Sequence, residues 1–190
     1  WELHVPFSYG LSLWDLVYEQ GATPVGIETY ANSRRMEKSL RLQNADLLTE
    51  YNLIEAGLQR LKVKADEFHG KAAYEEIRER EQQPAYLCTF SMLDNIDASG
   101  VARYPVGQCP IIDPQTGEVP VDSLGRRSYL TSIAFGPSIG KNIGLGYLPA
   151  ELAEVGREFT MEYFDEPFPI VVEAVGYGAL YDPENKLPRT

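Results

Sequence analysis

The chain has 190 residues, of which 44% are hydrophobic and 24% charged, and its formal net charge is −11. This length is enough for one or two domains with a substantial core. The acidic balance argues against a nucleic-acid-binding surface, which needs clustered cations to neutralise phosphates. No apolar run approaches the roughly 20 residues of a membrane-spanning helix, so we predict neither a nucleic-acid nor a membrane partner.

The first predicted elements are a strand and a helix. Residues 1–5 alternate between apolar and polar side chains, which is typical of a half-buried strand, and Pro6 ends it. A helix is expected to begin at Ser8 and to end at Gly21. Because the chain starts within a predicted strand, on Trp1 rather than on Met, we expect that further sequence precedes it.

Helical patterns continue up to residue 82. The segment 27–43 is rich in helix formers, and as a helix it would place Tyr30, Ser33 and Glu37 on one face. A polar break within 46–58 precedes a further helix, which is predicted over 68–81.

The core of this first part is expected to contain three particular apolar side chains. They are Leu58, Val63 and Tyr74. The outer face of the helix over 68–81 is charged, which leaves its apolar stripe to face that core.

The pattern changes after Pro84 to short apolar or alternating runs that are separated by turn signals. These runs cover 85–93, 108–113, 128–135, 143–148, 158–164 and 169–181. Short strands at this spacing are typical of a small antiparallel barrel or sandwich. The sequence therefore predicts an α+β protein with a boundary near Gln82 to Pro84.

Glycine-rich segments in this second part do not fit nucleotide-binding motifs. The stretch GPSIGKN, residues 136–142, is one residue short of a phosphate-binding loop and lies between predicted strands, so we expect a tight turn. The glycines of 144–146 lack the third glycine and the helix of a dinucleotide fingerprint. Ser132 lacks the glycine-flanked elbow of a hydrolase, and the residues alone indicate no reaction.

Cysteine and histidine are scarce, with two residues of each type. Cys88 and Cys109 make no disulfide framework, and we expect reduced thiols, as in intracellular proteins. With His4 and His69 they show no zinc-ligand spacing, so no metal site is predicted. We expect a cytoplasmic location, or the mitochondrial matrix in a eukaryote.

Several segments occur in an order that is specific as a series. In chain order they are WELHVP, RRMEKSLR, DLLTEYNLIEAGL, FHGKAAYEE, LTSIAFGPSIGKNIGLGYLPAELAEVG and ALYDPENKLPR. This series resembles the tetrahydrofolate-binding aminomethyltransferase family, typified by the glycine-cleavage T-protein. The closer likeness is to the C-terminal folate domain of dimethylglycine and sarcosine dehydrogenases, and it covers nearly the whole chain.

The resemblance implies a division of the chain. Residues 1–82 would be the C-terminal part of the three-lobed folate-binding module, and residues 85–190 a C-terminal antiparallel β-barrel. By alternation, Ile170, Val172 and Ala174 would fill the barrel interior. The turn after the strand over 128–135 is expected to pack against the folate module.

The resemblance also implies cofactor-binding residues. Glu2 matches the family glutamate that binds the pterin ring, since a carboxylate can accept two adjacent N–H donors; the alternative is a solvated strand glutamate. Arg35 and Glu37 match a family arginine and glutamate, which predicts an ion pair that holds the module together. Tyr30 precedes Ala31, where family members carry an arginine near the ligand; Tyr30 would contact the ligand or lie buried in the core.

The implied function is tetrahydrofolate-dependent one-carbon transfer. A flavin (FAD) domain or partner would oxidise an N-methyl amine to an iminium, and tetrahydrofolate would take up the carbon, as in dimethylglycine or sarcosine dehydrogenases. The catalytic acid or base is expected upstream and not in this chain, which alone is predicted to be inactive. A flavin-independent transferase acting on other methyl donors, including O- or S-methyl compounds, and a non-catalytic folate-binding or scaffolding module stay open, as does a homo-oligomer.

Overall fold

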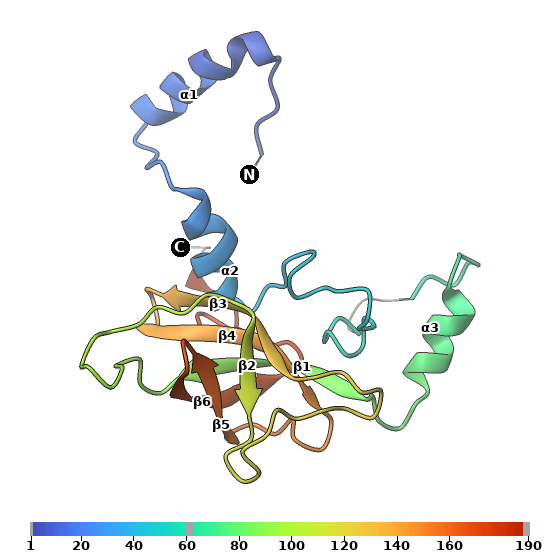
Figure 1. Cartoon of the computed structure of the whole chain (residues 1–190). Coiled ribbons are helices and arrows are strands. Elements are labelled where there is room, and N and C mark those ends of the chain that lie inside the picture. Colours follow the sequence, from blue (N-terminus) through green and yellow to red (C-terminus); the bar gives the residue numbers. More distant parts are fainter. Residues whose placement is uncertain (1, 60–62, 188–190) are drawn as a thin grey trace.

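A closed barrel of six antiparallel strands dominates the computed structural model, which describes residues 2–59 and 63–187 (Figure 1). The strands are β1 (Ala85–Met92), β2 (Cys109–Ile112), β3 (Tyr129–Gly136), β4 (Lys141–Pro149), β5 (Glu158–Tyr163) and β6 (Glu166–Val175). Their order around the barrel is β1-β4-β3-β2-β5-β6, closed between β6 and β1. Each predicted run overlaps one strand, and the α+β fold with an antiparallel barrel is confirmed.

The barrel interior is filled by alternate side chains of its strands, which form one apolar core. Ile170 and Val172 are 1% exposed, as predicted. Ala174 is only partly buried, because the register of β6 against β1 shifts between Val172 and Ala174. This bulge changes which side chains point inward, so Val175 packs against the core in place of Ala174.

Two glycines in β4 make room for this core. A Cβ atom on Gly146 would lie 2.6 Å from the backbone oxygen of Tyr129 on β3. A Cβ atom on Gly144 would lie 3.0 Å from the Leu130 side chain. The glycine pair is therefore a packing feature of the barrel, which agrees with the rejection of a dinucleotide fingerprint.

A second apolar cluster covers the outer face of β1, β3 and β4. Met36 and Tyr51, which precede the barrel in the chain, pack there against Leu87, Ile143 and other buried side chains. The ring of Tyr51 stacks on that of Tyr147, with centroids 3.5 Å apart and planes 3° from parallel. Residues 36–51 are thus joined to the barrel by a buried apolar contact.

The helices lie outside the barrel (Figure 1). A 3-10 turn (Phe7–Tyr9) leads into α1 (Gly10–Glu19), and a π-helical segment (Thr29–Arg34) continues into α2 (Arg35–Glu37). The last helix, α3 (Lys71–Arg78), falls within the predicted 68–81. None of the helices in 2–59 and 63–187 has the length and apolar character that crossing a bilayer requires.

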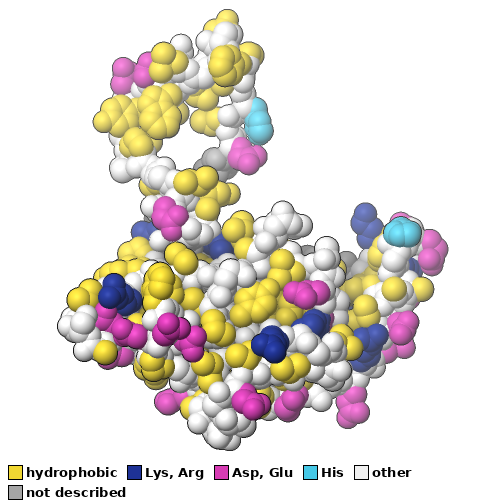
Figure 2. All heavy atoms as spheres, viewed as in Figure 1, with side chains coloured by type: hydrophobic (Ala, Val, Ile, Leu, Met, Phe, Trp, Pro, Cys, Tyr) yellow, Lys and Arg dark blue, Asp and Glu magenta, His cyan; other side chains and the backbone are white. Residues whose placement is uncertain are grey.

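The segment 2–30, here called the arm, projects from the barrel (Figure 1). Helix α1 has no buried residue, and Figure 2 shows hydrophobic side chains over the arm surface. Trp14, for example, is 57% exposed. The predicted strand over 1–5 is wrong for its described residues, which pair with no strand of 2–59 or 63–187 and are exposed. A strand needs a hydrogen-bonded neighbour, and alternation alone does not supply one.

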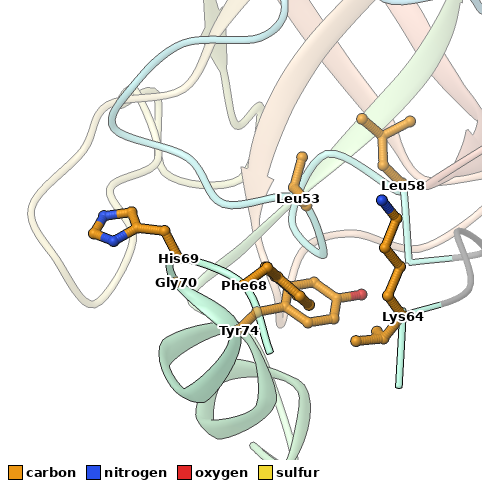
Figure 3. A pocket seen from close by; sticks show the side chains of 8 residues that line it. Leu53, Leu58, Lys64, Phe68, His69, Gly70 and Tyr74 are labelled. Atoms are coloured by element: carbon orange, nitrogen blue, oxygen red, sulfur yellow. The ribbon is translucent and has the colours of Figure 1, made fainter. Parts of the chain in front are cut away.

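Leu58, Val63 and Tyr74 are half-buried and do not form the predicted closed core. They line an open hollow of about 480 Å³ between the 53–58 loop and α3, with Phe68 and Lys64 on its walls. In Figure 3 the Phe68 and Tyr74 side chains are drawn beside each other among the lining residues, whereas His69 points away from them. The side chains lie together as predicted, but this space between them is not filled.

One carboxylate organises the loop 94–103. The stability of this loop should therefore fall at acid pH. Asp97 accepts hydrogen bonds from the Ser99 hydroxyl at 2.7 Å, the Val101 amide at 2.8 Å and the Arg103 guanidinium at 2.6 Å. These bonds, led by that from Ser99, lower the pKa of Asp97 to about 2. Since the pKa is depressed on folding, the loop's contribution to stability is present above the ordinary aspartate pKa and is lost as the pH falls toward about 2.

The measurement is an NMR titration of the Asp97 carboxyl together with amide exchange of Val101. We expect Asp97→Asn to reduce the protection of the Val101 amide against exchange at neutral pH. In this variant the protection should no longer depend on acid pH. A midpoint near the ordinary aspartate value would contradict the assignment.

Candidate functional site

The junction between the arm and the barrel is held by a buried ion pair. Arg35 donates to the carboxylate of Asp46 at 2.7 Å, to the hydroxyl of Ser132 on β3 at 2.8 Å and to the carbonyls of Ala31 and Leu40. The two charged side chains are 9% and 0% exposed. The predicted Arg35–Glu37 pair is therefore wrong, since the chain turns after α2 and brings Asp46 under the guanidinium.

Glu37 takes a different set of partners. Its carboxylate, 1% exposed, accepts hydrogen bonds from Arg34 at 3.0 Å and from the backbone amide of Ser138 at 2.6 Å. Arg34 also donates to the Ser138 hydroxyl at 2.6 Å. Ser138 lies in the turn between β3 and β4, so the turn predicted over 136–142 is present and packs against α2, as expected.

The end of the chain closes over the same helix. Lys38 donates to the Asp182 carboxylate at 3.1 Å and to the Asn185 side chain at 2.9 Å. The Leu180 and Tyr181 amides donate to the Glu37 carbonyl, each at 3.0 Å. Residues 35–38 are thus fixed by contacts from three separate parts of the barrel region.

A hollow of about 380 Å³ lies beside this junction, and we call it the arginine hollow. Its lining residues are Tyr30, Ala31, Arg34, Arg35, Leu40, Arg41 and Leu42. Three of these seven residues carry guanidinium groups and none is acidic. The hollow brings together Tyr30 and Arg35, two of the three residues that the sequence predicts as cofactor-binding.

Arg41 lies at the base of this junction. Its guanidinium donates to the backbone carbonyls of Ser39 at 2.5 Å, Ala56 at 3.0 Å and Gly176 at 2.7 Å. It also lies over the Tyr177 ring, 5.4 Å from the centroid. No carboxylate of the described chain pairs with it, and burial lowers its pKa, a shift that nearby Asp46 only partly offsets.

The three predicted cofactor-binding residues are placed differently. Tyr30 is 77% exposed, so it is not a core residue, and its ring is free to contact a ligand. Arg35 uses four of its five N–H groups within the protein, which favours a positioning role. Glu2 lies outside the arginine hollow, with its side chain 87% exposed and 3.4 Å from His4.

Sequence reasoning missed Asp46 and Arg41. Asp46 had a signal, because four cations between residues 34 and 41 require acidic partners and Asp46 is the first acid after Glu37. Arg41 had no such signal in the sequence. Helix α2 ends at Glu37, so the helical spacing between Arg34 and Arg41 does not apply.

The cysteines do not contribute a nucleophile. Cys88 is 0% exposed in the barrel core, and burial raises the pKa of its thiol to about 12. Burial also raises the pKa of Cys109, which is 5% exposed. Both thiols therefore stay protonated and enclosed near neutral pH. Residues 2–59 and 63–187 contain no group of three or more acidic, histidine or cysteine side chains arranged to hold a metal ion.

Comparison with known proteins identifies relatives of this arrangement. Residues 105–176 match the family described as Glycine cleavage T-protein C-terminal barrel domain. An aminomethyltransferase from Desulforamulus reducens is 30% identical over 173 residues, which cover 87% of this chain and 42% of that protein. Human mitochondrial dimethylglycine dehydrogenase is 28% identical over 179 residues, covering 90% of this chain and 19% of that protein.

The fold has a solved counterpart. The glycine cleavage system aminomethyltransferase T from Bartonella henselae superposes with a TM-score of 0.73 at 19% identity, over 93% of this chain and 45% of that one. The chain thus spans less than half the length of each of these relatives. Each matched share is larger than the barrel, so the similarity extends to residues that precede it.

Proposed function

We propose that the chain is part of a tetrahydrofolate-dependent enzyme that transfers one-carbon units, because residues 105–176 match the family described as Glycine cleavage T-protein C-terminal barrel domain. The observation that carries this proposal is the 30% identity to an aminomethyltransferase over 173 residues, which cover 87% of this chain and therefore extend beyond the barrel. A barrel alone is compatible with many functions, whereas a likeness that extends beyond it favours a shared one.

The more specific proposal is that the chain is the folate half of an N-methyl amine dehydrogenase. The relationship to human dimethylglycine dehydrogenase, at 28% identity over 90% of the chain, supports it. FAD bound by other sequence or by a partner would oxidise the amine to an iminium, and tetrahydrofolate would accept the carbon. We propose that residues 1–82 belong to the folate module and 85–190 to the barrel domain.

The residues of this chain fit the binding of a pterin. The Glu2 carboxylate is exposed and contacts only His4 among the described residues, so both oxygens can accept N–H donors of a heterocycle. The exposed Tyr30 ring lies at the arginine hollow and offers a face on which another aromatic part of the carrier can stack. These residues would contribute binding and orientation, and holding two reactants together is worth up to about 7–11 kcal/mol of a reaction barrier.

Two measurements on the intact protein that contains this chain test this proposal. Calorimetric titration with tetrahydrofolate asks whether the protein binds the carbon carrier. An assay for methylene-tetrahydrofolate formed from dimethylglycine, with the flavin absorbance recorded on the same sample, asks whether it is an amine dehydrogenase. Absence of tetrahydrofolate binding would overturn both proposals and favour a scaffolding role.

A flavin-independent aminomethyltransferase is the second candidate. The chain covers 42% of the Desulforamulus reducens aminomethyltransferase but only 19% of human dimethylglycine dehydrogenase. Tetrahydrofolate binding by a protein without flavin absorbance, and without activity on dimethylglycine, would favour this candidate.

Replacing Glu2 tests the pterin contact. We expect Glu2→Ala to weaken tetrahydrofolate binding by about 1.5–3 kcal/mol, the usual contribution of a hydrogen bond to a charged group. Calorimetry gives the affinity. Glu151→Ala is the matched control, since this glutamate is exposed in the turn after β4, and it should leave the affinity unchanged. Equal affinities of the two variants would exclude Glu2 from the pterin site.

A further inference from the structure

The arginine hollow carries positive charge in a protein whose net charge is −11. Its wall includes Arg34, Arg35 and Arg41 and contains no acidic residue. The Arg34 side chain is 53% exposed, and only its Nη1 group has partners in the described chain, Glu37 and Ser138. Its remaining N–H groups are available to a ligand.

The acids near the hollow do not neutralise it. Glu37 is held by the Ser138 amide and by Arg34, and it lies against the β3–β4 turn. Asp46 is held by Arg35, by the Leu42 amide at 2.8 Å and by the Thr131 hydroxyl. Two buried acids therefore offset two of the three guanidinium charges.

The third guanidinium, that of Arg41, forms no ion pair with a carboxylate of residues 2–59 and 63–187. Its hydrogen bonds go to three carbonyls, it lies over a tyrosine ring, and nearby Asp46 only partly offsets the effect of its burial. A partly buried cation without a counter-ion is unfavourable, whereas an anion beside it would be held in a charge-assisted contact. The geometry therefore favours an anionic group at this position.

We propose that the arginine hollow binds an anionic group, a carboxylate or a phosphate, with Arg34 and Arg41 as the cationic partners. A heterocycle that donates N–H groups finds no carboxylate on this wall, so the hollow does not fit the pterin itself. The anion comes either from the glutamyl part of tetrahydrofolate or from a free organic acid or phosphate. The first source rests on the proposed function, and the second does not.

Glutarate and inorganic phosphate are the probes, each titrated calorimetrically into the protein. We expect Arg34→Gln to weaken binding of the preferred probe about tenfold, and Arg34→Lys to weaken it less. Arg80→Gln is the matched control, since it removes the same charge from an exposed pair on the surface beside α3 and should leave binding unchanged. Equal losses in Arg34→Gln and Arg80→Gln, or no binding of either probe, would overturn the proposal.

A second variant keeps every arginine. Leu42 lines the hollow and is 38% exposed, so Leu42→Glu places a carboxylate there without removing a contact of Arg34 or Arg41. We expect it to abolish binding of both anions while the melting temperature changes little. Unchanged anion binding by Leu42→Glu would also overturn the proposal.

Tetrahydrofolate distinguishes the two sources. If the glutamyl part of tetrahydrofolate enters the hollow, glutarate competes with tetrahydrofolate. Arg34→Gln then weakens the binding of tetrahydrofolate but not of a tetrahydropterin that lacks the glutamyl part. If the anion is a free acid or phosphate, Arg34→Gln weakens only the binding of the probe. A protein that binds a probe through Arg34 but no tetrahydrofolate would support the hollow and overturn the proposed function.

Discussion

Replacing Arg35 with methionine should lower the free energy of unfolding by about 3–5 kcal/mol, the usual effect of breaking a buried ion pair. The loss arises because the Asp46 carboxylate, 0% exposed, would stay buried without its cation. Asp46 would keep the Leu42 amide and the Thr131 hydroxyl, which are weaker partners for a full charge. Urea denaturation followed by circular dichroism gives the difference.

Two comparisons make this prediction specific. Arg80→Met breaks an exposed pair with Glu76 on the surface beside α3 and should change stability by no more than about 0.5 kcal/mol. The double variant Arg35→Met/Asp46→Leu removes both charges and should be more stable than the single Arg35 variant. If the double variant loses the sum of the two single losses, the residues do not act as a pair.

Replacing Phe159 with alanine should destabilise the barrel by about 3–5 kcal/mol, through lost apolar burial and the cavity left behind. Phe159 on β5 is 1% exposed and meets the Phe90 ring of β1 edge to face, with centroids 6.4 Å apart. These strands are not neighbours in the barrel, so the contact crosses its interior. Thermal melting measures the loss.

The matched control is another phenylalanine at the end of the same hairpin. Phe164 lies in the turn between β5 and β6 and is 82% exposed. Phe164→Ala should change stability by no more than about 0.5 kcal/mol. Comparable melting temperatures for the two variants would mean that Phe159 does not fill a packed interior.

The barrel was predictable because its signals are local. Each strand shows a short apolar or alternating run, and each turn has its own residues, such as the glycines and proline of 136–140. The bulge beside Ala174 was not predictable, because it arises from how β6 meets β1 across the barrel. The strand proposed over 1–5 failed for the same reason, since pairing requires a neighbouring strand.

The candidate site was predictable in part. Tyr30 and Arg35 line the same hollow, but they are five residues apart, a spacing that a regular α-helix over 27–43 does not place on one face. The π-helical segment Thr29–Arg34, with its longer turn, brings them together. The partner of Arg35 was misassigned to Glu37, because the choice between two nearby acids depends on the turn after α2. The position of Arg41 depends on Ala56 and Gly176, which are distant in sequence.

The apolar contact of Met36 and Tyr51 with the outer face of the barrel has a consequence for how the protein can be divided. Cutting the chain between Gln82 and Pro84 would expose that face to solvent on one fragment. The residues that cover it would be left on the other fragment. We therefore expect residues 36–59 and the barrel to unfold in a single cooperative transition. Excision of the barrel alone should give an aggregation-prone product, whereas trimming the arm up to residue 26 should leave that transition intact.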